Sequence, residues 1–211
     1  MKRLQIEDGP GEAYNVSVRV NWGKWLLNPE VCARILIRLL NKCAAEFGVS
    51  ILAYVLMSNH FHLVCQSPPD PLYRRLTTRV TKNRHRVPWP PHHLKASVLR
   101  QLMHQLLWRS SRCIQRELGI KGHLWETSYF ATQIQDVTQL LVAVAYDHLN
   151  PVVENMTLRP EDHARSSAAW WAGEAPAEVE FLRHPLPFDL EIVDFRASLL
   201  ALQADKIGVR I

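Results

Sequence analysis

The first periodic stretch of the sequence, residues 14–20, alternates apolar and polar side chains, with a valine at every second position from 16 onward. A period of two predicts a half-buried β-strand. A helix is expected next, with Asn28 as its N-cap and Pro29 at its first helical position. Its apolar residues recur three and four positions apart until Gly48, where we expect the helix to end.

Residues 51–66 consist of two short apolar segments joined by a polar turn, and they predict two strands. His60 and His62 follow the turn directly. Because side chains two positions apart on a strand point to the same face, the two imidazoles should project together while Phe61 points away. Such a pair can hold a metal ion from two points. Two ordinary, partly buried histidines are the alternative.

Two helices are expected in the segment that follows. Residues 72–86 predict a basic helix, which a proline cluster at 88–91 ends because proline cannot continue a helix. Residues 95–118 predict the second helix from their apolar spacing, with Gly119 as its C-cap.

A further strand is predicted over residues 123–134, followed by a helix with Asp136 as its N-cap. With the earlier elements, this gives strand, helix, two strands, helices, strand and helix in chain order. That order favours an α+β domain in which an antiparallel sheet carries helices on one side.

The helix predicted over residues 136–150 has its apolar residues on one stripe. At about 100° per residue, Tyr146 lies opposite that stripe, and Asn150 lies one turn further along the same side. Pro151 is expected to end the helix, since the residue before a proline is disfavoured in the helical conformation. The alternative for Tyr146 is an exposed tyrosine without a chemical role.

The positive charge of the chain is concentrated in one segment. The net charge is +5, yet the stretch from Pro71 to Arg116 contains eleven Lys or Arg and no Asp or Glu. Such a stripe favours a polyanionic partner, because each phosphate contact releases condensed counterions. A solvated basic face without a partner is the alternative. The cations expected to contact the polyanion are Arg74, Arg75, Arg79, Lys82, Arg84 and Arg86.

Neither a bilayer-spanning apolar run nor the apolar region of a signal peptide is visible, so we expect a cytoplasmic protein. The four cysteines have no paired spacing of the metal or redox type. They predict buried free thiols.

Residues 54–64, Tyr-Val-Leu-Met-Ser-Asn-His-Phe-His-Leu-Val, resemble the signature of the single-tyrosine HUH transposases, the insertion-sequence-200 type and its REP-associated relatives. HUH stands for His, hydrophobic, His. The likeness continues through residues 122–126, 146–152 and 159–167, and covers roughly residues 13–173. It implies the ferredoxin-like sheet of the HUH nucleases, with helices on one side.

The resemblance also implies a site and a reaction. Tyr146 would be the nucleophile, and Asn150 would complete a divalent metal site with His60 and His62. The metal would be Mg²⁺ or Mn²⁺. The implied reaction is cleavage and rejoining of single-stranded DNA through a 5′-phosphotyrosine intermediate. The implied partners are single-stranded or hairpin DNA, with the protein acting as a monomer or a homodimer.

The expected organisation has a leader at residues 1–12, the HUH transposase domain at 13–173 and a C-terminal extension at 174–211. An inserted loop is expected at about 87–94. The extension could pack on the domain or bind a partner. Of the tryptophans, Trp89, Trp108 or Trp125 could stack on bases, although core packing is favoured. A domesticated DNA-binding protein of the same fold without strand transfer is the alternative function.

Overall fold

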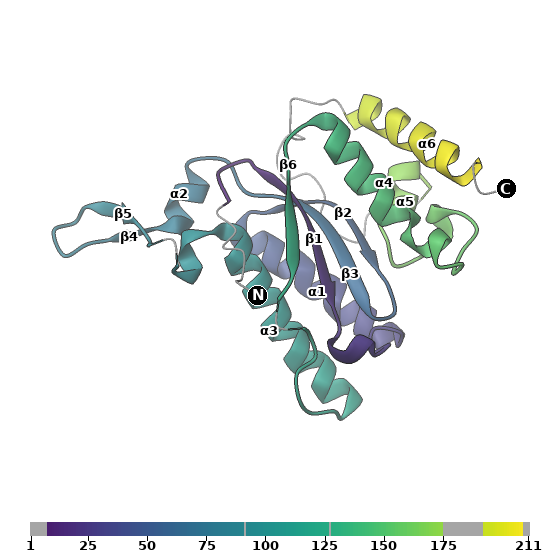
Figure 1. The fold of residues 1–211 in the computed structure, drawn as a ribbon. Coiled ribbons are helices and arrows are strands. Elements are labelled where there is room, and N and C mark those ends of the chain that lie inside the picture. The colour runs from purple at the N-terminus through teal and green to yellow at the C-terminus, as the bar shows by residue number, and fades with distance from the viewer. Residues whose placement is uncertain (1–7, 91, 127, 175–191, 209–211) are drawn as a thin grey trace.

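The computed structural model describes residues 8–90, 92–126, 128–174 and 192–208. Its central elements are β1 (Ala13–Arg19), α1 (Glu30–Phe47), β2 (Ser50–Leu56), β3 (His60–Gln66), α3 (Val98–Leu118) and β6 (Phe130–Ile134). The four strands form one antiparallel sheet in the order β2, β3, β1, β6. This chain order and strand order define a ferredoxin-like domain. The predicted α+β fold is therefore confirmed (Figure 1).

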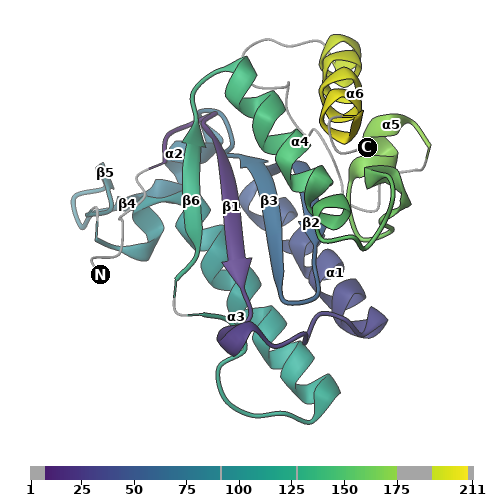
Figure 2. The same ribbon diagram turned by 45° about the vertical axis from the view of Figure 1, so that its right-hand side comes forward.

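Helices cover both faces of the sheet, whereas the sequence predicted helices on one side. α1 and α3 lie on one face and share the larger hydrophobic core with it. α4 (Val137–Val153) packs on the other face, where α5 (Ala168–Ala172) and α6 (Ile192–Gly208) accompany it. Figure 2 shows α4 in front of the strands, with α1 and α3 behind them. The sheet thus separates two layers, of which the α4 layer carries Tyr146.

The start of α1 differs from the prediction. Pro29 occupies the N-cap position and no side chain caps the helix. Asn28 instead uses its Oδ1 atom to accept a hydrogen bond from the Ser58 hydroxyl, 2.8 Å away in the turn between β2 and β3. The predicted end is confirmed, because Gly48 has φ 64° and is the C-cap.

The predicted basic helix over residues 72–86 is wrong beyond its first turns. α2 (Leu72–Thr77) ends after six residues, and β4 (Thr78–Val80) and β5 (Arg86–Pro88) then form a hairpin that projects from the body (Figure 1). Thr78, Val80 and Thr81 directly follow α2, and β-branched side chains favour strands over helices. The loop expected at about 87–94 therefore begins inside this hairpin.

Two further boundaries differ. The predicted strand over residues 123–134 is reduced to β6, and among the described residues before it Trp125 forms an isolated bridge with Val20. The second predicted helix begins at Val98, where the Ser97 side chain accepts a hydrogen bond from the Arg100 backbone N–H. Its predicted C-cap, Gly119, is confirmed by a φ of 63°.

α4 begins as predicted and ends later. The Asp136 side chain accepts a hydrogen bond from the Gln139 N–H, which confirms the N-cap. Pro151 lies inside the helix rather than ending it. Proline cannot donate to the carbonyl of Asp147, four residues earlier. The Asn150 side chain supplies a donor to that carbonyl at 3.5 Å, and the helix continues to Val153.

The described part of the C-terminal extension packs on the domain. α6 lies against α4, Leu199 is buried between them, and Gln203 contacts the His148 ring. All four cysteines are free, three of them buried and Cys113 half-buried. In the described residues, no helix has both the length and the apolar character needed to cross a bilayer.

Candidate functional site

The two histidines of β3 lie side by side on the α4 face of the sheet. The ring centroids of His60 and His62 are 5.1 Å apart. Phe61 points to the opposite face, where its ring packs against Trp125 at 5.5 Å in the larger core. The alternation predicted from the sequence is therefore confirmed.

The turn before β3 fixes the proton on His60. The Nδ1 atom of His60 is 2.7 Å from Oδ1 of Asn59. The orientation of the Asn59 amide is set by its Nδ2 atom, which donates to the Gly23 carbonyl at 3.4 Å. Because a carbonyl oxygen only accepts, Nδ1 of His60 carries the proton and Nε2 keeps its lone pair.

A buried carboxyl group plays the corresponding part for His62. Nδ1 of His62 is 3.5 Å from Oδ1 of Asp147, which is fully buried on α4. The same oxygen accepts a hydrogen bond from Asn15 at 3.4 Å. If Nδ1 of His62 carries a proton towards this oxygen, Nε2 is again the free ligand atom. Orientation of a ligating imidazole through its other nitrogen is the usual arrangement at metal sites.

Burial keeps both imidazoles neutral. It lowers the pKa of His62 to about 4, with smaller contributions from His60 and Arg19. Burial and Arg19 also lower the pKa of His60. The pKa of Asp147 is raised well above its ordinary value because the carboxyl group is removed from water. At neutral pH the two histidines are thus in the form that binds metal ions.

Tyr146 lies over this pair from α4. Its side chain is 59% exposed, as predicted for a residue opposite the apolar stripe, and its ring centroid is 5.8 Å from that of His62.

Asn150, one turn later, donates from Nδ2 to the Tyr146 carbonyl at 3.0 Å. Its Oδ1 is then the atom that can face a cation. Glu154, a further turn along, acts electrostatically on His60. The exposed side of α4 therefore runs along the histidine pair, and Asn150 lies between Tyr146 and Glu154.

The predicted donor set is chemically suited to a divalent metal. Two neutral imidazole nitrogens and one amide oxygen are donors that a divalent metal can use, and they leave positions open for substrate oxygen. In the part of the chain that the structure describes, no cluster of three or more His, Cys, Asp or Glu side chains forms a metal site of another kind.

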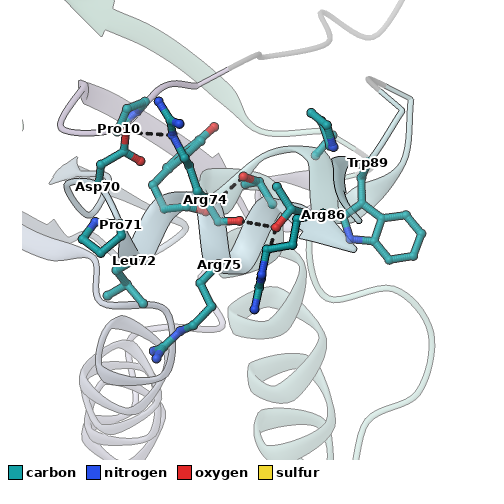
Figure 3. Close-up of a pocket in the computed structure, with 13 residues that line it drawn as sticks. Pro10, Asp70, Pro71, Leu72, Arg74, Arg75, Arg86 and Trp89 are labelled. Atoms are coloured by element: carbon teal, nitrogen blue, oxygen red, sulfur yellow. Dashed lines mark hydrogen bonds and ion pairs between the residues drawn. The ribbon is translucent and has the colours of Figure 1, made fainter. Parts of the chain in front are cut away.

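The predicted DNA-contacting cations lie at the far end of β3 from the histidines. Arg74 and Arg75 are on α2, Arg79 and Arg86 are on the hairpin strands, and Lys82 and Arg84 are in the hairpin turn; all six are exposed. A pocket of about 990 Å³ lies at the base of the hairpin (Figure 3). Arg74, Arg75, Arg86 and Trp89 are among its lining residues. Since β3 has seven residues, the two ends are separated by roughly 20 Å.

The three tryptophans singled out in the sequence have different environments. Trp125 is 6% exposed and belongs to the core, where its indole N–H donates to the Ser110 hydroxyl at 3.0 Å. Trp89 stacks on His93 with 4.0 Å between centroids, and the Arg79 guanidinium lies 5.2 Å from the Trp89 ring centre. Trp108 is 51% exposed on α3, on the face of the sheet opposite the histidines.

Two contributors to the site were not recognised in the sequence. Asp147 falls three residues after Val144 of the apolar stripe, so an acidic residue at an inward position was the available signal. Asn59 belongs to the motif, but its hydrogen bonds to Gly23 and His60 depend on tertiary structure.

Among solved structures, the fold is similar to that of a REP-associated tyrosine transposase bound to a REP hairpin. The TM-score is 0.59 at 14% identity, and the match covers 86% of this chain and 96% of that chain. A putative transposase from Deinococcus radiodurans matches with a TM-score of 0.39 at 18% identity, over 71% of this chain and 97% of that one. No protein-family model matches the sequence, and no curated protein does.

The chain therefore has a fold similar to that of this REP-associated tyrosine transposase, as the sequence resemblance implied.

Proposed function

We propose that this protein is a metal-dependent tyrosine transposase that cleaves and rejoins single-stranded DNA. The observation that carries the proposal is the position of Tyr146. Its ring lies 5.8 Å from that of His62, on the exposed side of α4, directly above the paired imidazoles. A tyrosine that served only the fold would not need this neighbourhood.

His60, His62 and Asn150 would hold the divalent metal, Mg²⁺ or Mn²⁺. Each imidazole has a lowered pKa and turns Nδ1 towards a side-chain oxygen, which leaves Nε2 to bind the metal. The Asn150 amide nitrogen is already engaged with the helix, so its oxygen is the remaining donor. A bound metal would polarise the phosphodiester and offset its negative charge.

Tyr146 would supply the attacking oxygen. Its Oη would form a bond to phosphorus while the bond from phosphorus to the 3′ oxygen breaks, and the released 3′ oxygen would take up a proton. The product is a 5′-phosphotyrosine. A different 3′ hydroxyl could then attack the same phosphorus, release Tyr146 and reseal the strand, which hydrolysis would not permit.

The basic end of the molecule would hold the DNA. Six exposed cations, Arg74, Arg75, Arg79, Lys82, Arg84 and Arg86, lie on α2 and the β4–β5 hairpin. The similar transposase structure contains a REP hairpin, which supports single-stranded or hairpin DNA as the partner. Phosphate contacts at this end would position a strand whose cleavage occurs at the other end of β3.

The test is the covalent adduct. The full chain is incubated with labelled single-stranded and hairpin oligonucleotides from the DNA flanking its gene, with Mn²⁺ or with a chelator. We expect a labelled protein band on a denaturing gel only with metal. Tyr146→Phe should abolish the band. Tyr129→Phe should retain it, because Tyr129 is a half-buried tyrosine just before β6 that packs against the larger core. An adduct in the Tyr146→Phe variant, or none with any oligonucleotide and metal, would overturn the proposal in favour of a DNA-binding protein without strand transfer.

A further inference from the structure

The loop between β1 and α1 presents two tryptophans to solvent. Trp22 is 84% exposed and Trp25 is 69% exposed, whereas Trp125 and Trp171 are buried. Large aromatic side chains are mostly removed from water in folded proteins, and isolated exceptions need no explanation. Two such exposures within four residues are different, because they put two large aromatic side chains on the surface of one short loop.

The backbone at Trp22 is unusual for so large a residue. Its φ is 63°, in the left-handed region that bulky side chains rarely adopt. Glycine would take this conformation without steric cost. The Trp22 side chain is mostly exposed, so its burial offsets little of that cost. The fold therefore does not need a tryptophan at this position. Unfavourable backbone conformations of this kind cluster at functional sites.

Hydrogen bonds hold the loop against the turn that precedes His60. The Val20 N–H donates to the Asn59 carbonyl at 2.7 Å, and the Leu27 N–H donates to the Ser58 carbonyl at 3.0 Å. Asn59 also joins the loop to the site, since its Nδ2 bonds to the Gly23 carbonyl while its Oδ1 holds His60. Figure 2 shows this loop, in purple after β1, beside the β2–β3 turn.

The charges around the loop suit a nucleic-acid strand. Lys24 is exposed between the two tryptophans. Arg19 is exposed at the end of β1 and is the register partner of His60. Aromatic rings interleaved with cations are typical of surfaces that bind single strands, where bases stack on the rings and cations contact phosphates. Paired bases inside a duplex cannot offer their faces in this way, so the chemistry selects unpaired bases.

We propose that Trp22 and Trp25 form a stacking platform for unpaired bases adjacent to the phosphodiester at the histidine pair. This inference rests on the proposed function, because it takes single-stranded DNA as the substrate. It adds a base-binding subsite to a site otherwise defined by phosphate contacts. Stacking there would hold the strand beside Tyr146 without selecting a base by hydrogen bonding.

The experiment measures equilibrium binding without cleavage. All proteins carry Tyr146→Phe, metal is omitted, and two strands of equal length are compared, one of mixed sequence and one with abasic sites throughout. In a Trp22→Gly, Trp25→Ala variant, affinity for the strand with bases should fall by about fivefold to a hundredfold per lost stack. Affinity for the abasic strand should be unchanged. The salt dependence should also be unchanged, because no cation is removed.

Two controls separate stacking from folding. Glycine suits the backbone of residue 22, so the double variant should fold. Phenylalanine in place of glycine at residue 22 (Trp22→Phe) should restore most of the binding, because phenylalanine also stacks. Trp108→Ala removes a tryptophan that is 51% exposed on the opposite face of the sheet and should have no effect.

The platform is overturned if the double variant binds the strand with bases like its parent, or if it loses the abasic strand equally. Its failure is distinguishable from failure of the proposed function. Adduct formation by the unmodified chain with unchanged binding in the double variant would remove the platform alone. Base-dependent binding without any adduct would keep the platform and remove the transposase proposal.

Discussion

Asp147 is fully buried beneath His62, and its Oδ1 atom lies 3.5 Å from Nδ1 of that histidine. The separation is longer than a strong hydrogen bond, so the main effect of the contact is to orient the His62 ring. Because Asp147 is next to Tyr146 on α4, one turn of helix positions both the proposed nucleophile and the support of a metal ligand. The site is therefore an arrangement of two elements, β3 and α4, rather than a single motif.

Asp147→Asn should weaken metal binding without unfolding the protein. Asparagine has nearly the same shape and is less costly to bury than a carboxylate, but it supports the imidazole less well. We expect the Mn²⁺ affinity to fall by about tenfold to a hundredfold, as for other residues that orient a metal ligand. Calorimetric titration measures this change. Asp136→Asn is the matched control, because asparagine caps the same helix equally well. An unchanged Mn²⁺ affinity in Asp147→Asn would show that the contact has no role.

Metal binding should persist into mildly acidic solution. From the sequence alone, loss is expected near pH 6.5, where an ordinary histidine takes up a proton. The structure moves this expectation, because burial lowers the pKa of His60 and lowers that of His62 to about 4. Mn²⁺ affinity should therefore persist to lower pH than two ordinary imidazoles would allow, and protonation of His62 should remove it as the pH approaches 4. Two ordinary imidazoles would instead cost up to about a hundredfold per pH unit below 6.5. A His60→Ala, His62→Ala variant should not bind at any pH.

The hairpin turn should contribute to DNA affinity through charge. Arg74 is already paired with Asp70 at 3.0 Å, and Arg79 lies over Trp89, so Lys82 and Arg84 are better placed to reach phosphates. Lys82→Gln with Arg84→Asn should lower single-strand affinity and flatten the salt slope by roughly 0.7 per lost contact. Asparagine is chosen because residue 84 has φ 61°, which it tolerates.

The control for this variant is Arg34→Gln with Arg38→Gln, which removes two exposed cations from α1, on the face of the sheet opposite the histidines. Filter binding across a range of salt concentrations gives both slopes. Equal slopes for the parent and the hairpin variant would place the DNA elsewhere.

Sequence periodicity predicted the site better than its surroundings. A period of two is clear in β1, an apolar run after a polar turn indicates β3, and a helical stripe is clear in α4, so the facing of His60, His62 and Tyr146 could be predicted. The strands of the β4–β5 hairpin have three residues each, which is too short for any period to appear. The cations there fit a helix and a hairpin equally well.

Contacts between distant residues could not be predicted in the same way. Asp147 meets His62 across 85 positions of sequence, and Asn59 meets Gly23 across 36. Pro151 gave a misleading stop signal because the Asn150 side chain replaces its missing donor. The exposure of Trp22 and Trp25 likewise depends on how the turn of the loop is held by Asn59 and Leu124.

The last prediction concerns His148, a fully buried residue that joins α4 to the C-terminal helix. Gln203 Nε2 donates to its Nδ1 at 3.2 Å, so Nε2 carries the proton and donates to the Ser167 hydroxyl at 2.8 Å. Protonation would place a second N–H against the Gln203 donor. Burial accordingly lowers the pKa of His148 to about 3.

The pKa of His148 is lower in the folded protein than its unfolded value of about 6.5. The contribution of neutral His148 to folding stability is therefore complete above pH 6.5 and is lost as the pH falls towards 3. Between pH 6.5 and 5 this one residue should lower the free energy of unfolding by about 2 kcal/mol.

His148→Gln keeps a donor for Ser167 but cannot be protonated. It should be less stable than the parent at pH 7, by about 1–3 kcal/mol for the unpaired Gln203 donor, and should lose less stability between pH 7 and 5. Urea unfolding at both pH values measures the difference. His104→Gln, at an exposed position of α3, should follow the parent. If His148→Gln lost as much stability on acidification as the parent, His148 would not be the titrating group.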